Sequence, residues 1–483
     1  MASRARVGAC LSLLCALPAW AGVHGWQQPS GNWAVLQVDP SSPGATISSS
    51  LVGFWISKGP GGFGNNWAVP SNTQLISLLA TLGTNGSVRV GGTPCASSET
   101  PGSYQTAPVT LQQTQDFHDF LAAIGSGWAS HVNWCLNMAY TTMGVDDITY
   151  ASGEVANFES VFGSGVTVYA IGNEPDLYYS SYAEFESQWN IFYSAVQASY
   201  PSSKWSGPEI ASAFTGGAGW ARQFVADEGS KLTFFTQHFY TNPLSTWTPD
   251  TLLYWLPRNI GVPQFESPLS YDAAAVTTPF QMNETSTTIN QQQGLSNAAV
   301  AATWAVDLAI GAAENGWRGF NINIGCGSGG YNLAVNCTGD FHSPTGWFAN
   351  PMLAGMQLAT NIEGAQILPV TQTISGTTLE VIGVLTSTGN AALLIANLDA
   401  DNPATVIPQS SAAWTTATAT VVNGDNSGGA CGPTGAASLC ADINGVLMSS
   451  ATGACVSSCP PTTVAKGGYV VIPAGGAALV VLQ

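Results

Sequence analysis

Short apolar runs alternate with helix-like segments between residues 51 and 325. Several runs are apolar at consecutive positions and rich in β-branched or aromatic residues, as is typical of parallel strands that are covered on both faces. We therefore expect eight strands in this region, over residues 51–58, 86–92, 131–138, 166–174, 204–210, 232–240, 279–284 and 319–325.

The segments between these runs have the period of amphipathic helices. Their apolar residues recur at i, i+3, i+4 and i+7, or at part of that spacing, which places them on one helical face. The stripes are Leu75, Leu78, Leu79 and Leu82; Phe117, Phe120, Leu121 and Ile124; Phe185, Trp189 and Phe192; and Val300, Trp304 and Leu308. Eight strand–helix units over this length predict an α/β fold of the (β/α)8 TIM-barrel type, which takes about 250 residues.

The pattern changes beyond residue 354, where helical periodicity fades. Alternating Val-, Thr- and Gly-rich segments separated by turn residues predict a C-terminal antiparallel β-sandwich over residues 355–483. We assign residues 46–354 to the barrel. An isolated strand over residues 32–40 precedes it, and we expect the N-terminal segment 22–45 to pair with the sandwich.

Residues 1–21 have the order of a secretory signal peptide. Arg4 and Arg6 precede an apolar stretch over residues 7–17, and Ala19-Trp20-Ala21 supplies a cleavage site with small residues on either side. The apolar stretch is too short to span a bilayer. We therefore expect a secreted, extracellular protein that is not anchored in a membrane.

The remaining cysteines and the charge fit that compartment. Cleavage removes Cys10 and Cys15, and the other cysteines lack the Cys-x-x-Cys pairs of zinc sites, which favours disulfides. Cys326 with Cys337 is the pairing that proximity suggests, and the others stay open. Asp and Glu total 28 against 10 Lys and Arg, a net charge of -18, which argues against nucleic acid and anionic membranes as partners.

Two glutamates end strands that would open at the same mouth of the barrel. Glu174 ends the fourth expected strand and Glu284 the seventh, and active sites of such barrels lie at the carboxyl ends of the strands. Two facing carboxyl groups about 5–5.5 Å apart are the arrangement of a retaining glycosidase. The alternative for Glu174 is a helix start at Pro175, with Asp176 at the positive end of the helix dipole.

Glu284 also has alternatives. It would be a surface carboxylate if its Thr-rich surroundings formed an exposed turn, and Glu266 in "QFESPLS" is a second candidate nucleophile on a shorter strand-like run. Asn283-Glu284-Thr285 is formally a glycosylation sequon. A location at the barrel mouth predicts that Asn283 is unmodified.

The motifs around these glutamates resemble glycoside hydrolase family 79, the β-glucuronidase and heparanase group of clan A. The resemblance rests on "IGNEPD", "QMNETSTT" and "GLSNAAVAATWAVDLAIGAAENGWRGFNI", together with "VRVGG", "HFY" and the Gly-rich apolar tail, and it runs through most of the mature chain. It implies a (β/α)8 barrel with a C-terminal β-sandwich and a carbohydrate substrate. We expect the chain to act as a monomer.

The resemblance also implies roles for individual residues. Glu174 corresponds to the acid/base, Glu284 to the nucleophile, and Asn173 to the residue that binds the sugar 2-hydroxyl. Tyr240 would orient Glu284, and Arg89 would help to keep it ionised. A purely structural ion pair is the alternative for Arg89. The implied reaction needs no metal and no organic cofactor.

The sequence departs from the family where the C5 substituent of the sugar would be recognised. Family members that bind a glucuronate carboxylate often have a tyrosine five residues after the nucleophile, where this chain has Ile289. The eighth strand reads Asn-Ile-Asn-Ile-Gly, without the histidine that follows the Asn-aromatic pair in the family. Tyr331 and the amides of the "GCGSGG" loop are our candidates for replacing these contacts, and an ordinary tight loop is the alternative for them. Asn323 is a further candidate for binding the substrate.

Three functions therefore remain open at the level of sequence. The first is a secreted retaining β-glucuronidase that removes terminal glucuronic or 4-O-methylglucuronic acid, and the second is a clan A glycosidase for a neutral sugar. The third is a catalytically silent glycan-binding protein, for which the 16 Trp residues would supply stacking surfaces. The pair of glutamates favours an enzyme.

Overall fold

A computed structural model gives the structure of the chain. It describes residues 31–58, 67–95, 109–138, 147–211, 218–240, 252–253, 278–287, 298–325, 334–340, 343–423 and 442–483, the last range without residues 445, 449–450, 453 and 456–457. The expected signal peptide, Cys326, Tyr331, Glu266 and Ile289 lie outside the described residues.

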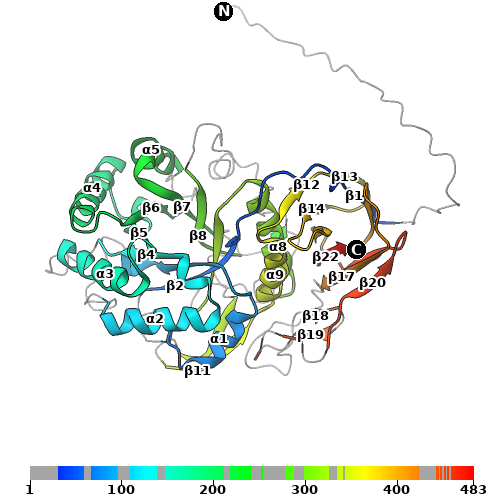
Figure 1. Ribbon diagram of the computed structural model, residues 1–483, viewed down its shortest axis with the longest axis horizontal. Helices are drawn as coiled ribbons and strands as arrows, with labels where there is room; N and C mark the ends of the chain where they lie inside the picture. Colours follow the sequence, from blue (N-terminus) through cyan, green and yellow to red (C-terminus); the bar gives the residue numbers. More distant parts are fainter. Residues whose placement is uncertain are drawn as a thin grey trace, which may run out of the picture.

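Eight parallel strands close into a barrel, which confirms the predicted fold class (Figure 1). Each strand coincides with one of the apolar runs identified in the sequence. In barrel order they are β2 (Val52–Ser57), β3 (Ser87–Gly91), β4 (Val132–Leu136), β5 (Val168–Ile171), β6 (Lys204–Ile210), β7 (Leu232–Tyr240), β8 (Phe280–Ser286) and β9 (Gly319–Asn323). The carboxyl ends of all eight strands therefore meet at one mouth.

Helices surround the barrel and bury the predicted apolar stripes. They are α1 (Thr73–Ala80), α2 (Leu111–Ile124), α3 (Asp147–Phe162), α4 (Tyr182–Ser199), α5 (Ala218–Glu228), α8 (Val300–Glu314) and α9 (Pro351–Ala359). Thr110 and Gln113 form a reciprocal capping box that begins α2. Short 3-10 turns follow several strands and helices: η2 (Thr93–Cys95), η3 (Trp128–Ser130), η5 (Pro175–Leu177), η7 (Gly229–Lys231) and η8 (Thr360–Ile362).

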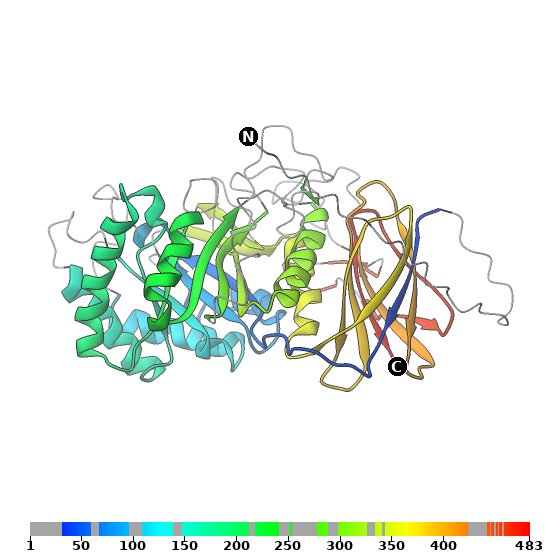
Figure 2. The same cartoon turned by 90° about the horizontal axis from the view of Figure 1, so that it is seen from above.

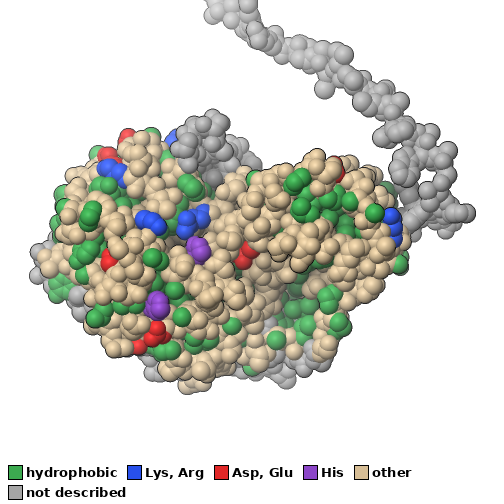
Figure 3. All heavy atoms as spheres, viewed as in Figure 1, with side chains coloured by type: hydrophobic (Ala, Val, Ile, Leu, Met, Phe, Trp, Pro, Cys, Tyr) green, Lys and Arg blue, Asp and Glu red, His purple; other side chains and the backbone are tan. Residues whose placement is uncertain are grey.

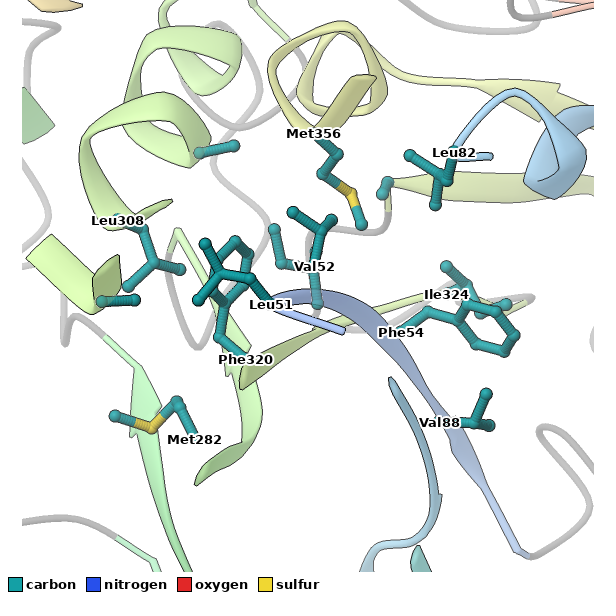
Figure 4. Close-up of a cluster of buried hydrophobic side chains, with 14 of the residues drawn as sticks. Leu51, Val52, Phe54, Leu82, Val88, Met282, Leu308, Phe320, Ile324 and Met356 are labelled. Atoms are coloured by element: carbon teal, nitrogen blue, oxygen red, sulfur yellow. The ribbon is translucent and has the colours of Figure 1, made fainter. Parts of the chain in front are cut away.

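Helices α8 and α9 lie between the barrel and the sandwich (Figure 2). Every residue of α8 from Val300 to Ala313 is buried, because one side of the helix packs on the barrel and another on the sandwich. The buried side chains drawn in Figure 4 show the barrel side of this core, where Met356 of α9 and Leu308 of α8 lie near Val52 and Phe320. One continuous core therefore joins the two parts of the molecule.

Two sheets form the sandwich. The four-stranded sheet has the order β13 (Val370–Ser375), β1 (Trp33–Val38), β16 (Ala404–Ser410) and β21 (Val470–Ile472). The larger sheet contains β12 (Gln366–Leu368), β14 (Leu379–Leu385), β15 (Ala391–Asn397), β22 (Ala477–Leu482), β17 (Thr416–Val422), β18 (Asp442–Ile443) and β19 (Val446–Leu447), with β20 (Thr462–Ala465) paired to β17.

The N-terminal strand β1 enters the four-stranded sheet, pairing antiparallel with β13 and parallel with β16. Its alternate residues Ala34, Leu36 and Val38 are buried in the sandwich core. The parallel pairing is the one departure from an antiparallel arrangement among the described strands of the sandwich. A hairpin of β10 (Val335–Asp340) and β11 (Ser343–Ala349), which the sequence pattern did not predict, follows the barrel.

Disulfides link segments at the barrel mouth and in the sandwich. Cys95 pairs with Cys135, and Cys455 pairs with Cys459. Cys337 is also disulfide-bonded. None of the described helices is long and apolar enough to cross a membrane. Charged side chains are sparse on the face shown in Figure 3, as expected when only 8% of residues are charged.

Glu363 caps the amino end of β2, at the opposite end of the barrel from the strand ends that carry the candidate residues. Its carboxylate accepts the backbone N–H of Val52 at 2.8 Å. Burial raises the pKa of Glu363 to about 8, against the hydrogen bonds from the backbone of Val52 and Leu51. The folded state thus holds this proton more tightly than the unfolded chain. Its contribution to stability is full below about pH 4.3 and is lost as the pH rises through 8.

We expect the melting temperature of the wild type to fall between pH 5 and pH 8. Glu363→Gln keeps an acceptor oxygen for Val52 but does not titrate, so it should flatten this fall by about 2 °C or more. Thermal unfolding followed by circular dichroism at both pH values measures the difference. Asp119→Asn, at an exposed carboxylate of α2, is the matched control. An unchanged pH dependence in Glu363→Gln would contradict the assignment.

Candidate active site

The turn after β5 carries Glu174. Gly172 and Glu174 both have left-handed backbone conformations, with φ of 83° and 47°, and Pro175 then begins η5. A Cβ atom at Gly172 would clash with the sulfur of Met138, so only glycine fits there. A short 3-10 helix thus begins at Pro175, as the alternative interpretation of Glu174 predicted. The side chain of Glu174 does not cap that helix and is bound by His238 instead.

The neighbouring strand β6 also has a glutamate with a left-handed backbone conformation near its end. Glu209 has a φ of 59°, and its carbonyl accepts the backbone N–H of Glu174 at 2.8 Å. Asp176 reaches the same strand end, where its carboxylate accepts the N–H of Ala211 at 2.9 Å. A left-handed conformation costs a residue with a side chain about 1–2 kcal/mol, so two of them side by side indicate a functional constraint.

Glu284 lies on β8 and is 4% exposed, so the alternative of a surface carboxylate is wrong. The hydroxyl of Tyr240, from the end of β7, donates to its Oε1 at 2.6 Å. The Nη1 of Arg89 donates to its Oε2. Both oxygens of the predicted nucleophile thus accept hydrogen bonds from residues to which the family resemblance gave a role beside Glu284.

Arg89 is fully buried on β3, where its guanidinium lies over the ring of Trp55 with 5.7 Å between its Cζ and the ring centroid. A Cβ atom at Gly91 would clash with this guanidinium, which explains the glycine two residues on. Nη2 donates to Asn173 Oδ1 at 2.5 Å and lies 3.1 Å from Glu209 Oε2. Arg89 therefore joins the predicted nucleophile to the residue beside the predicted acid/base, and it is also an ion-pair partner.

Three residues to which the sequence analysis gave no role in the site complete this network, namely His238, Glu209 and Asn283. The ring of His238, on β7, has Nδ1 3.0 Å from Glu174 Oε1 and Nε2 2.8 Å from Glu209 Oε2. Asn283 donates to Glu209 Oε1 at 2.5 Å and to Asn133 Oδ1 at 2.9 Å. The histidine of "HFY" could have been found from its position two residues before Tyr240. Nothing in "KWSGPEI" distinguishes Glu209 from a surface glutamate at a strand end.

Opposite charges control the titration of His238 and Glu209. Burial works against the charge on His238, but the negative charge of Glu284 and the hydrogen bonds to Glu174 and Glu209 outweigh both burial and Arg89 and raise its pKa to about 9. Burial likewise opposes the ionisation of Glu209, yet Arg89 and the donors His238 and Asn283 lower its pKa to about 2. An imidazolium can donate from both ring nitrogens, here to Glu174 and to Glu209.

The pKa of Glu284 is shifted in the opposite direction to that of Glu209. Burial raises the pKa of Glu284, and the nearby Glu174 adds to the effect, whereas His238, Arg89 and the hydroxyl of Tyr240 oppose it. The cations thus have to offset burial before Glu284 can act as an ionised nucleophile. With Arg89 and His238 positive and Glu209 and Glu284 negative, the charges of these four side chains balance.

The two predicted catalytic carboxylates lie close together. One oxygen of Glu174, one oxygen of Glu284 and a ring nitrogen of His238 all lie within 4.8 Å of one another. Such a cluster could also hold a metal ion. However, Glu284 is already paired with the guanidinium of Arg89, whose positive charge would repel a cation, so these residues fit a metal poorly.

The predictions for Asn323, Tyr331 and Asn283 have different outcomes. Asn323 ends β9 in register with Trp55 of β2, but no hydrogen bond within the described part of the chain joins its side chain to the carboxylates. Tyr331 lies outside the described residues. Asn283 is fully buried with its amide nitrogen donating twice, so it is inaccessible to a glycan.

No protein-family model and no curated protein sequence matches the chain. Solved structures match its fold. A 4-O-α-L-rhamnosyl-β-D-glucuronidase from Fusarium oxysporum 12S is 18% identical with a TM-score of 0.64, covering 93% of this chain and 100% of that one. A GH51 arabinofuranosidase from Xanthomonas axonopodis pv. citri is 14% identical with a TM-score of 0.61, covering 94% and 100%. A monomeric β-xylosidase from Caulobacter crescentus CB15 is 14% identical with a TM-score of 0.59, covering 93% and 99%.

These similarities show the fold along almost the whole chain. At such identities they do not transfer a substrate or a site. The arrangement of a barrel followed by a β-sandwich is thus shared with enzymes whose names describe cleavage of glycosidic bonds.

Proposed function

We propose that the chain is a retaining glycoside hydrolase with Glu284 as nucleophile and Glu174 as acid/base. The observation that carries this proposal is that one carboxylate oxygen of Glu174 and one of Glu284 lie within 4.8 Å of each other at the barrel mouth. Retaining enzymes have carboxyl groups about 5–5.5 Å apart, whereas inverting enzymes need about 6.5–9.5 Å to admit a water molecule. The fold shared with three glycosidases supports the same reaction class.

The reaction follows from the contacts of the two glutamates. Glu284 Oε2 or Oε1 attacks the anomeric carbon while Glu174 protonates the departing oxygen, which gives a covalent glycosyl-enzyme. Glu174, then ionised, removes a proton from water, and this water releases the sugar with its configuration retained. Arg89 holds the oxygen of Asn173, so that the NH2 group of this amide can donate to the sugar 2-hydroxyl.

We further propose a terminal β-glucuronide, including its 4-O-methyl form, as the substrate. The resemblance of the motifs around Glu174 and Glu284 to family 79 supports this choice, as does the name of the Fusarium enzyme. The arabinofuranosidase and the β-xylosidase favour the second candidate, a neutral sugar. Secretion after removal of residues 1–21, with a barrel over 46–354 and a sandwich formed by 22–45 and 355–483, completes the proposal.

The substrate is tested by assaying the purified chain on aryl β-glucuronide, β-glucoside, β-xyloside and α-arabinofuranoside. We expect kcat/KM to be highest on the glucuronide, with the β-anomer of the sugar released first in proton NMR. Hydrolysis confined to the neutral substrates would replace glucuronate with a neutral sugar. Release of the opposite anomer would contradict the retaining mechanism itself.

A further inference from the structure

Glu209 is a third carboxylate beside the two catalytic ones, and the proposed reaction does not use it. Its side chain is completely buried at the end of β6. Both oxygens are occupied: Oε1 accepts from Asn283 at 2.5 Å, and Oε2 lies 2.8 Å from His238 Nε2 and 3.1 Å from Arg89 Nη2. With three donors around it and no exposed surface, Glu209 cannot attack a sugar.

Its partners are the residues that hold the catalytic pair. His238 contacts Glu174 through its other ring nitrogen, and Arg89 binds Glu284 through its other terminal nitrogen. Asn283, the third partner, directly precedes Glu284 in β8. The backbone carbonyl of Glu209 also accepts a hydrogen bond from the N–H of Glu174. The side chain and the backbone of Glu209 therefore both help to position residues at the barrel mouth.

We propose that Glu209 is a positioning residue that acts on both catalytic carboxylates, through His238 on Glu174 and through Arg89 on Glu284. This inference rests on the proposed function. Its physical basis is twofold: the carboxylate fixes the orientation of two cationic side chains, and its negative charge balances one of the two positive charges. Without that charge one of the groups that raise the pKa of His238 would be lost, so His238 would lose its proton at lower pH.

Glu209→Gln is the sharpest variant because it keeps the size of the side chain. Glutamine offers one acceptor oxygen and one NH2 group, so it must point a donor at Asn283 or at the pair of Arg89 and His238. We expect kcat/KM to fall about 10²-fold, chiefly through kcat, because small misplacements of catalytic groups have effects of that size. We also expect the alkaline limb of the pH–rate profile to move to lower pH.

Two further variants separate positioning from stability. Glu209→Asp keeps the charge on a shorter side chain, so it should lose activity at least fivefold while its alkaline limb stays at the wild-type pH. Glu154→Gln removes a buried carboxylate from another ion pair, in which Lys58 also donates to the carbonyl of Cys135. This control should lower the melting temperature without moving the alkaline limb.

A readout independent of activity is the titration of His238 by NMR of 13C-labelled histidine, assigned with His238→Gln. We expect a pKa of about 9 in the wild type and a clearly lower one in Glu209→Gln. If no glycoside were hydrolysed by the wild type, the proposed function would fail, and this titration would still decide whether Glu209 controls His238. An active wild type with an unmoved alkaline limb and an unchanged His238 titration in Glu209→Gln would overturn the inference. If Glu209→Gln does not fold, the rate of Glu209→Asp decides: a loss of at least fivefold is the expected result, and full activity in that variant would overturn the inference.

Discussion

Glu284→Ala should reduce kcat on aryl glycosides by about 10⁴- to 10⁶-fold, the range seen when a covalent nucleophile is removed. The variant retains Glu174, but no group remains to attack the anomeric carbon. Its fold should survive, because alanine leaves a small space beside Arg89 and Tyr240 that water or an anion can enter. Steady-state rates against the wild type, with circular dichroism to verify folding, measure the loss.

Rescue of Glu284→Ala by azide is the control for the assignment of Glu284 as nucleophile. A small anion that occupies the space left by Glu284 can attack from the same side, and the positive charge of Arg89 should attract it. We expect azide to restore cleavage of the glycosidic bond in Glu284→Ala by displacing the leaving group, which gives a glycosyl azide of inverted configuration. Glu284→Gln is the matched control, since its filled site should not be rescued. Wild-type turnover by Glu284→Ala, or an azide product of retained configuration, would show that Glu284 is not the nucleophile.

The sequence predicted the barrel and the position of the two glutamates well, for a physical reason. Parallel barrel strands are covered on both faces, so their apolar runs stand out, and a carboxylate directly after such a run is placed at the mouth. Glu174 and Glu284 therefore could be paired over a long sequence separation. Tyr240 and Arg89 followed from motif resemblance, and the structure places both in contact with Glu284.

The role of Glu209 could not be predicted from the sequence in the same way. It too ends an apolar strand, but its partners come from β3, β7 and β8, and these contacts depend on the order of strands around the closed barrel. Its left-handed backbone conformation is equally invisible, because nothing in the flanking residues requires it. A carboxylate whose whole role lies in contacts across the barrel gives no local signal in the sequence.

The parallel pairing of β1 with β16 was hidden for a related reason. The alternation of buried Ala34, Leu36 and Val38 with more exposed residues predicts a strand with one buried face, but it does not specify the direction of the neighbouring strand. Only the position of β1 between β13 and β16 decides that. Helix α8 shows a further difference, since the sequence analysis identified one apolar stripe on it, whereas the structure buries it on every side between two layers.

Glu174→Ala should show a loss that depends on the leaving group, which distinguishes an acid/base from a residue needed for folding. General acid catalysis contributes about 10²- to 10⁴-fold. Poor leaving groups need the proton from Glu174, so their glycosides should lose activity in that range. The dinitrophenolate of a dinitrophenyl glycoside departs without protonation. Formation of the glycosyl-enzyme from this substrate should therefore be slowed far less. Measuring kcat/KM across aryl glycosides of graded leaving-group pKa tests this.

Two matched variants complete the argument for Glu174. Glu174→Gln keeps a side chain of the same size beside His238 but cannot deliver a proton, so it should show the same dependence on the leaving group. Asp176→Asn changes the carboxylate two residues on, which binds the backbone of Ala211, and should retain most of the wild-type kcat. Azide should accelerate Glu174→Ala and give a glycosyl azide of retained configuration, since the base that activates water is missing and an anion needs none. An equal loss on every leaving group would mean that Glu174 supports the site without donating the proton, and His238 would become the residue to test in that role.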